Sequence, residues 1–406
     1  MKPLEGITIV ELGVYVAVPN ATRQLSDWGA TVIKVESPTG EKGRWGGGAV
    51  NMPIKPDCNP YFAISNSGKE MVCLDLKTQD GLNILYDLLS KADVFASNFR
   101  YGSLVRLGLD YETLHARFPK LVCAYFNGYG FEGPEKDRPG YDMTAFWSKA
   151  GILNHIREPE VVPHIPPGGI GDTAAASNLA AGILAALIHR DKTGEGQQVT
   201  SSLLAAGVWC NAVQITAGQD RDQNDGLQPL RSPISYKQWR NPFYHIYECA
   251  DGKVFYLLGG GGLKMHATLK AIGLGELTED PRFADFATMK KNSGELYDRM
   301  IELFKTKTSQ EWFKIFNDLD APCEILSTNC DVSVDEQVWA NNFMTHMTCP
   351  NGYVYAIPNS PVDFSSMEKT QTQHAHYVGQ DTAKVLAEFG YTEEQIQDLK
   401  DRAVIK

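Results

Sequence analysis

The chain has 406 residues, which is long enough for two domains. Of these residues 43% are hydrophobic and 21% are charged, a composition typical of globular proteins. The formal net charge of −11 argues against a nucleic-acid partner, because such binding needs a basic face. We expect no membrane partner either, since no stretch of the sequence approaches the roughly 18 apolar residues of a membrane span.

Strand-like and helix-like segments alternate through the first half of the chain. Strands are predicted over residues 7–12, 31–36, 71–76, 93–99 and 120–130, and helices over 19–30, 80–92 and 111–119. Such alternation is typical of βαβ units and a mostly parallel sheet. The predicted fold class is therefore α/β.

The second half begins with a long helix of small residues after Asp172 and changes composition after about residue 217, where a polar segment rich in turn formers indicates a domain crossing. A hairpin is then predicted over residues 244–258. Helices are predicted around residues 263–272, 294–306 and 309–319, and again in the tail with a break at Gly390. These elements predict a smaller α+β unit after the sheet.

The eight cysteines are scattered and form neither a CxxC motif nor a Cys/His cluster. We therefore expect no metal site, no disulfide framework and a reducing, cytoplasmic location. The amino-terminal segment lacks the apolar region and cleavage site of a signal peptide and enters a strand at once, which agrees with that expectation.

Glycine-rich turns decide which cofactors the sequence favours. The first βα turn, GVYVAVPNA, lacks the GxGxxG spacing, and no strand is followed by a P-loop, so a dinucleotide-dependent oxidoreductase is not indicated and no cofactor is expected. The GGGG run at residues 259–262 is either a flexible turn or a backbone-rich lid or oxyanion contact. The sequence leaves both interpretations open.

One carboxylate, Asp172, stands in the segment PPGGIGDTAAASN without a histidine, serine or cysteine beside it. Helix capping is the first interpretation, because an aspartate at a helix N-terminus accepts hydrogen bonds from the first turn and is favoured by the helix dipole. A catalytic carboxylate is the second interpretation. The local sequence alone does not separate them.

Basic side chains fall at the ends of predicted strands or in the loops after them: Lys69, Arg100, Arg106, Lys136 and Arg138. Ligands of open α/β sheets bind at the carboxyl ends of strands, so these residues are candidates for binding phosphates. Taken singly, such residues are more often solvated surface charges.

A series of segments, in order along the whole chain, resembles the class III CoA-transferases, the superfamily of formyl-CoA transferase, carnitine CoA-transferase and α-methylacyl-CoA racemase. The segments are PLEGITIVEL, WGATVIKVESPTGEKGR, NSGKEMVCLDLKTQDG, ADVFASNFRYGSLVRLGLDYETL, NGYGFEGPEKDRPGYDMTAF, GGIGDTAAASNLAAGILAALIHRDKTGEGQQV and GQDTAKVLAEFG. The resemblance implies an interlocked homodimer. Each subunit would have a Rossmann-like large domain, residues 1–217 with a return at 329–406, and a small α+β domain at 218–328.

The resemblance also implies a mechanism in which Asp172 is the nucleophile. Asp172 would attack an acyl-CoA thioester to form a mixed anhydride, and the expelled CoA thiolate would convert this to an aspartyl-CoA thioester; an incoming acid then reverses the steps. Because thiolate is a good leaving group and an aspartate is normally ionised at pH 7, neither a general base nor a cofactor nor a metal is expected. Gly168, Gly169 and Gly171 are expected to let the backbone approach the oxyanion.

Further positions follow from the same resemblance. The candidates for CoA binding are Lys69, Arg100, Arg106 and Leu107; Tyr141 and Asp142 match a pair beside the nucleophile, and Tyr15 and Val16 are expected to line the acyl pocket. Val16 replaces an active-site glutamine of formyl-CoA transferase, and residues 218–245 are too short for that enzyme's glycine lid. These departures resemble the branch that acts on enoyl-CoA and 2-hydroxyacyl-CoA in amino-acid fermentation, so an apolar 2-hydroxy acid is expected as substrate.

Two other functions stay open. An α-methylacyl-CoA racemase needs an acid/base pair, and the racemases have a histidine where this chain has Tyr141, whose unperturbed pKa of about 10 suits α-proton abstraction poorly. His155 and His164 lie nearby in sequence and could substitute. A non-catalytic CoA-binding protein is the alternative from another class, disfavoured because the whole GGIGD turn is kept.

Overall fold

The computed structural model describes residues 1–52, 54–55, 57–217 and 241–406. The chain forms two compact units: the larger comprises Met1–His155, a stretch that begins at Ile165, and Glu336–Lys406, and the smaller comprises Ile156–His164 and a stretch that ends at Asp335. The predicted border at residue 218, and most of the segment expected to be too short for a lid, lie outside the described residues. The return to the larger unit begins at Glu336, after the predicted residue 329.

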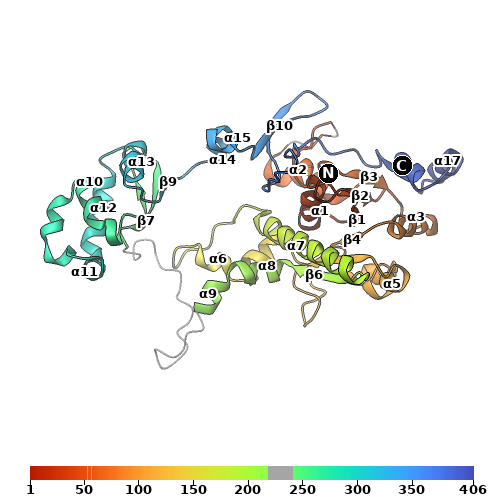
Figure 1. Ribbon diagram of the computed structural model, residues 1–406, viewed down its shortest axis with the longest axis horizontal. Helices are drawn as coiled ribbons and strands as arrows, with labels where there is room; N and C mark the ends of the chain where they lie inside the picture. The colour runs from red at the N-terminus through yellow and green to blue at the C-terminus, as the bar shows by residue number, and fades with distance from the viewer. Residues whose placement is uncertain (53, 56, 218–240) are drawn as a thin grey trace. The chain divides into compact units, whose positions relative to one another are not determined.

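A six-stranded sheet forms the centre of the larger unit, in the order β3-β2-β1-β4-β5-β6 (Figure 1). Its strands are β1 (Thr8–Leu12), β2 (Thr31–Glu36), β3 (Glu70–Cys73), β4 (Val94–Ser97), β5 (Val122–Asn127) and β6 (Gln198–Ser202). Every neighbouring pair is parallel, which confirms the predicted α/β fold class. The strand order reverses between β1 and β4, and ligands of such sheets bind at the carboxyl ends of the strands beside that point.

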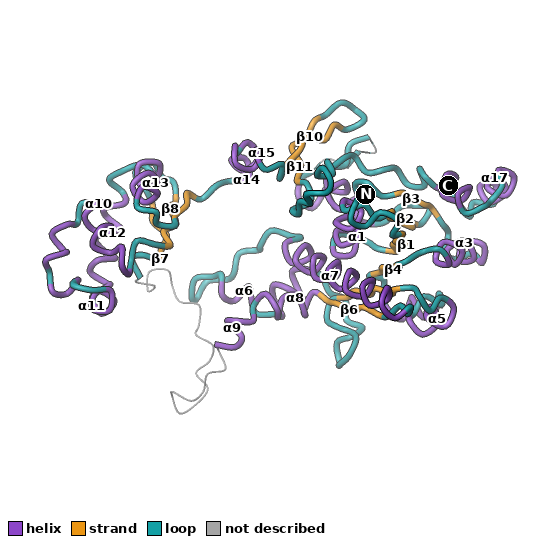
Figure 2. Tube along the Cα trace, in the orientation of Figure 1, coloured by secondary structure: helices purple, strands orange, loops and turns teal. Residues whose placement is uncertain are grey.

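Helices cover both faces of this sheet (Figure 2). One face carries α1 (Ala17–Asp27), the π-helical turn η2 (Asp142–Lys149), α7 (Ile170–Thr193) and α8 (Leu203–Cys210). The other face carries α3 (Gln79–Ser90), α4 (Tyr101–Arg106), α5 (Tyr111–Arg117), α16 (Thr382–Glu388) and α17 (Glu393–Asp401). Because strand side chains alternate, Ile9 and Val94 enter one apolar cluster while Val10 and Phe95 enter the other.

Shorter elements complete the larger unit. They are the 3₁₀ segment η1 (Lys42–Val50), α2 (Pro60–Asn66), α6 (Ile152–His155), α9 (Ala212–Ala217), α15 (Glu336–Ala340) and the antiparallel hairpin of β10 (Met344–Thr348) and β11 (Val354–Pro358).

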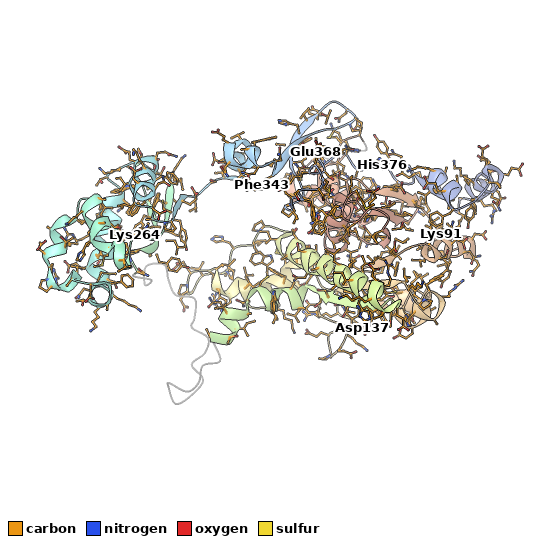
Figure 3. The ribbon with its side chains drawn as sticks, viewed as in Figure 1. Lys91, Asp137, Lys264, Phe343, Glu368 and His376 are labelled. Atoms are coloured by element: carbon orange, nitrogen blue, oxygen red, sulfur yellow. A yellow bond between two sulfur atoms is a disulfide. The ribbon has the colours of Figure 1, made fainter. Side chains whose placement is uncertain are left out.

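The carboxyl-terminal tail is bound to the edge of the sheet at β3. Asp381 Oδ2 accepts hydrogen bonds from the backbone N–H of Met71 and from His376 Nδ1, both at 2.7 Å. The Lys91 ammonium, at the end of α3, lies 4.6 Å from the centre of the Phe389 ring, at the end of α16. Lys91 and His376 are labelled in Figure 3. The tail is therefore part of the larger unit.

Helix α7 corrects the expectation that no segment resembles a membrane span. By length and composition alone it could cross a membrane. In the fold it packs against α1, β5 and β6 and buries residues such as Leu179 and Ile183. A helix that packs on a buried sheet can therefore have the length and apolar composition of a membrane helix.

The smaller unit is an α+β structure with its own apolar core. Its sheet contains β7 (Tyr244–Glu248), β8 (Val254–Leu258) and β9 (Cys323–Ile325), and the β7–β8 hairpin confirms the prediction. The helical elements are η3 (Gly262–Lys264), α10 (Met265–Ala271), η4 (Gly275–Glu279), η5 (Pro281–Phe283), α11 (Phe286–Lys291), α12 (Ser293–Phe304), α13 (Ser309–Asp318) and α14 (Asn329–Val334). Within the GGGG run, Gly259 packs against Pro322 and Gly260 against Thr268, as in a tight turn.

A disulfide joins Cys58, in the segment before α2, to Cys349, at the end of β10. Their Cα atoms are 5.1 Å apart although 291 residues separate them in sequence. The expectation that the cysteines form no disulfide is therefore wrong for this pair. The scattered spacing gave no indication of it, because only the packing of the β10–β11 hairpin on α2 brings the two side chains together.

A buried cluster of charges supports the loops at the carboxyl ends of β1 and β2. Glu11 binds Lys34 Nζ at 2.6 Å and Lys69 Nζ at 2.7 Å, and all three side chains are fully buried. Burial alone would raise the pKa of Glu11, but the charges of the two lysines outweigh it and lower that pKa to about 2. Glu11 is therefore ionised throughout the ordinary pH range.

Replacing Glu11 with glutamine should lower the free energy of unfolding by about 3–5 kcal/mol, because the two lysines lose their shared buried counter-charge. Urea denaturation at pH 7 measures this change. Asp318→Asn is the control, since Asp318 pairs with Lys314 at 2.7 Å on the surface, where exposed pairs contribute at most about 1 kcal/mol. A loss in Glu11→Gln no larger than in the control would contradict the role of the cluster.

Candidate active site

Asp172 lies in the first turn of α7, after a glycine that directs the chain into the helix. Gly169 precedes the helix with φ of 88°, a left-handed conformation that glycine adopts without steric cost. Asp172 is the third residue of the helix and the acidic residue of its first turn, where the helix dipole favours a negative charge. Across the part of the chain that the structure describes, no side chain forms a hydrogen bond or ion pair with this carboxylate, so the dipole is the part of the capping interpretation that the structure supports.

The carboxylate that does bind the helix end is Asp142, at the start of η2. Its Oδ2 accepts a hydrogen bond of 2.7 Å from the Gly169 N–H, and only 5% of the residue is exposed. A Cβ atom at position 171 would overlap Asp142 Oδ1 and the Phe146 ring, so only glycine fits there. The Gly171 N–H also points to the Asp142 carboxylate and lowers its pKa against the larger effect of burial, so the oxyanion role predicted for Gly169 and Gly171 meets a competing acceptor, and for Gly168 it stays a prediction.

Two carboxylates close together change the ionisation of the site. Burial, with the negative charge of Asp142 added, raises the pKa of Asp172 to about 7. The expectation that Asp172 is fully ionised at pH 7 is therefore wrong: near neutral pH the group is divided between its neutral and ionised forms. The helix dipole does not outweigh burial here.

Helices α1 and α7 run side by side in the same direction. Asn20 Nδ2 donates to Thr173 Oγ1 at 3.2 Å, and four residues further along both helices Gln24 Nε2 donates to Ser177 Oγ at 3.4 Å. The N-termini of both helices therefore lie together, just after β1 ends. Their first-turn N–H groups and positive dipole ends lie beside Asp172.

Tyr15, Tyr61 and Tyr141 come from three segments next to the N-termini of these helices. The Tyr15 and Tyr141 rings meet edge to face with their centres 6.1 Å apart, and Tyr141 is 61% exposed. Burial and the charges of Asp172 and Glu41 raise the pKa of Tyr61, which places Tyr61 close to the same carboxylate. The structure thus places Asp142 and Tyr61 near Asp172 and Tyr15 against Tyr141, which immediately precedes Asp142. Val16 is half-buried in the loop of Tyr15, and the pocket roles of Tyr15 and Val16 stay predictions.

Tyr61 was missed by the sequence analysis. It belongs to α2, far along the chain from Asp172, and no motif marks it. The one available signal is the glycine run just before α2, because Gly46 packs directly against the Tyr61 ring.

The predicted CoA-binding residues differ in how far they are exposed. Lys69 is 1% exposed, and its ammonium donates to Glu11 Oε2, to Pro19 O at 2.8 Å and to Asn66 Oδ1 at 3.0 Å, which uses all three hydrogens. The prediction that Lys69 binds CoA is therefore wrong. Arg100 and Arg106 are exposed at the two ends of α4 and Leu107 is half-buried after it, so these three stay predictions.

The two histidines considered for proton transfer lie in different units of the chain. His155 ends α6 and His164 belongs to the smaller unit. In the described ranges, neither makes a hydrogen bond or an ion pair with Asp172. No group of three or more His, Cys, Asp or Glu among the described residues is arranged to hold a metal ion, and the expectation of metal-free catalysis stays a prediction.

Comparison with known proteins identifies the family. The family model described as CoA-transferase family III matches residues 4–382. A cinnamoyl-CoA:phenyllactate CoA-transferase of Clostridium sporogenes is 35% identical over 98% of this chain and 97% of its own. An (R)-2-hydroxy-4-methylpentanoate CoA-transferase of Clostridioides difficile is 34% identical over 99% of both chains.

The fold has the same relatives. The crystal structure of a CAIB/BAIF family protein from Brucella suis matches 96% of this chain and 99% of its own with a TM-score of 0.81 and 27% identity. The sequence resemblance is thereby confirmed over nearly the full length. The chain belongs to CoA-transferase family III and is a CoA-transferase enzyme.

Proposed function

We propose that the enzyme moves CoA between an enoyl-CoA or 2-hydroxyacyl-CoA and a free 2-hydroxy acid with an apolar side chain, through covalent intermediates on Asp172. The observation that carries the proposal is the Asp172 carboxylate itself, which has no hydrogen-bond or ion-pair partner among the described residues and lies at the joined N-termini of α1 and α7. The acid class is supported by two relatives whose names specify phenyllactate and 2-hydroxy-4-methylpentanoate.

The steps balance without a cofactor. Ionised Asp172 attacks the thioester carbonyl, CoA thiolate leaves, and a mixed anhydride forms. The thiolate then attacks the aspartyl carbonyl and releases the first acid, which leaves an aspartyl-CoA thioester. The acceptor carboxylate attacks that thioester, and thiolate attack on the acceptor's acyl carbonyl completes the transfer and frees Asp172. First-turn N–H groups of the two helices are suited to stabilise each oxyanion.

The remaining features of the proposal concern binding and assembly. Arg100, Arg106 and Leu107 contact CoA, no metal or cofactor takes part, and the enzyme works as a homodimer. The cytoplasmic location stays a prediction, and the Cys58–Cys349 disulfide is atypical of that compartment. The large apolar side chains on α8 and α9 support the dimer, because Trp209 is 77% exposed and Val213 is 76% exposed, as is typical of an interface surface.

Replacing Asp172 with alanine should reduce CoA transfer by at least about 10⁴-fold, because the covalent intermediates can no longer form. Wild-type enzyme incubated with acyl-CoA and hydroxylamine should carry a hydroxamate on Asp172, detectable by mass spectrometry. Asp137→Ala, at an exposed loop position, is the control and should retain activity.

Turnover retained in Asp172→Ala would overturn the covalent mechanism. Exchange of the α-hydrogen by the wild-type enzyme, without CoA transfer between acids, would instead favour the racemase alternative.

The pH dependence of kcat/KM should follow the ionisation of Asp172. Activity should rise with pH and level off above about pH 7, because only the ionised carboxylate is the nucleophile. Asp142→Asn keeps an oxygen for the Gly169 N–H but removes the neighbouring negative charge, so the rise should move to lower pH. An unchanged midpoint in Asp142→Asn would show that Asp142 does not tune Asp172.

A panel of acceptor acids tests the substrate class. Burying a four-carbon apolar side chain should contribute about 3 kcal/mol, or roughly two hundredfold in kcat/KM, relative to formate. Val16→Gln should reduce this preference, while Val16→Ala, which keeps the position apolar, should change it less. Formate or oxalate as the better acceptor by kcat/KM would contradict the assignment even if the covalent mechanism holds.

A further inference from the structure

Tyr15 holds a backbone conformation that a tyrosine rarely adopts. Its φ is 62°, in the left-handed region, where a residue other than glycine costs roughly 1–3 kcal/mol unless the surroundings enforce it. Tyr15 lies in the short loop between β1 and α1, just before the helix whose N-terminus lies beside that of α7. Neighbouring residues must therefore hold Tyr15 in this conformation.

Two side chains hold the loop. Asn98 fixes residue 14 from one side, since its Oδ1 accepts from the Val14 N–H and its Nδ2 donates to the Val14 carbonyl, both at 2.9 Å. Glu41 fixes Tyr15 itself, since its Oε2 accepts the Tyr15 N–H at 3.2 Å. Both contacts act on the backbone, so they impose the conformation whatever the side chain at position 15.

Glu41 can impose this conformation because its own position is fixed. It is 6% exposed, its backbone N–H donates to Glu36 Oε1 at 2.9 Å, and its Oε2 also accepts the Gly43 N–H. Its Oε1 lies 3.7 Å from Lys34 Nζ, which belongs to the buried charge cluster of Glu11. These contacts hold the Glu41 carboxylate against residues of the sheet, so it does not move freely as the end of a surface side chain would.

The conformation of Tyr15 determines where its ring lies. With the backbone in the left-handed region, the ring meets the Tyr141 ring edge to face. Tyr141 immediately precedes Asp142, whose carboxylate binds the Gly169 N–H at the start of α7. A change at the Tyr15 backbone would therefore move one wall of the space next to Asp172.

We propose that Glu41 is a positioning residue for acyl-group recognition: its buried carboxylate holds Tyr15 in the strained conformation that sets its ring against Tyr141 as a wall of the acyl pocket. The inference rests on the proposed function, because it takes Asp172 as the reacting group. Glu41 itself touches neither substrate nor the reacting atoms.

A double-mutant cycle tests this proposal. The readout is the ratio of kcat/KM for phenyllactate to kcat/KM for lactate, with the same acyl-CoA donor, because a general folding defect lowers both values and leaves the ratio unchanged. Glu41→Ala should lower the ratio about tenfold, since the Tyr15 wall is lost to the bulky acid only. Glu41→Gln, which keeps an oxygen to accept the Tyr15 N–H, should stay within about twofold of wild type.

The second arm of the cycle uses Tyr15→Gly, which adopts a φ of 62° without strain but has no ring. This variant should lower the ratio as Glu41→Ala does, and adding Glu41→Ala to it should lower the ratio no further. Equal effects of Glu41→Ala with and without the Tyr15 ring, or an unchanged ratio in Glu41→Ala, would overturn the proposal. If Glu41→Ala fails in one of these ways while Asp172→Ala is inactive, the proposal for Glu41 is wrong and the proposed function still stands. If Asp172→Ala is active, the proposed function itself is wrong.

Discussion

The carboxylate of Glu11, buried between Lys34 and Lys69, is the interaction on which the active-site loops depend. One acid cannot balance two lysines, and an uncompensated charge in a protein interior costs several kcal/mol. Burial lowers the pKa of Lys69 to about 7, so part of its charge is lost near neutral pH, and Glu41, in the loop after β2, places a second carboxylate 3.7 Å from Lys34 Nζ. In that position Glu41 also reaches the Tyr15 backbone.

Asp172, the nucleophile that we propose, is placed by the opposite arrangement. Asp142 and Asp172 carry like charges, and within the described structure neither of them forms an ion pair, so their proximity opposes folding. Asp142 is stabilised by the Gly169 N–H at the start of α7, and Asp172 is left with only the positive ends of two helices beside it. Sites that hold a reactive group often keep such unfavourable electrostatics, which the rest of the fold must offset.

The sequence predicted features that depend on neighbouring residues better than features that depend on residues far apart along the chain. The bounds of β2 and the β7–β8 hairpin follow from local pattern, and the resemblance places Asp172 at the head of a helix, as observed. Lys69 was assigned to CoA from the family resemblance and from its expected place at a strand end or in a loop, and no local pattern shows that its ammonium turns inward to Glu11. The Cys58–Cys349 bond and the contact of Asp142 with Gly169 also join distant segments, which a single sequence does not reveal.

Burial of Asp172 has two opposed consequences for the proposed chemistry. A carboxylate with a raised pKa is a stronger base and therefore a better nucleophile when it is ionised, but a smaller fraction of it is ionised at any given pH. The product of these two quantities is greatest when the pKa lies near the working pH, and a pKa of about 7 meets that condition near neutrality. Burial of Asp172 is the larger cause of that value, and the like charge of Asp142 adds to it, so the proximity that opposes folding also helps to bring the pKa of Asp172 near neutrality.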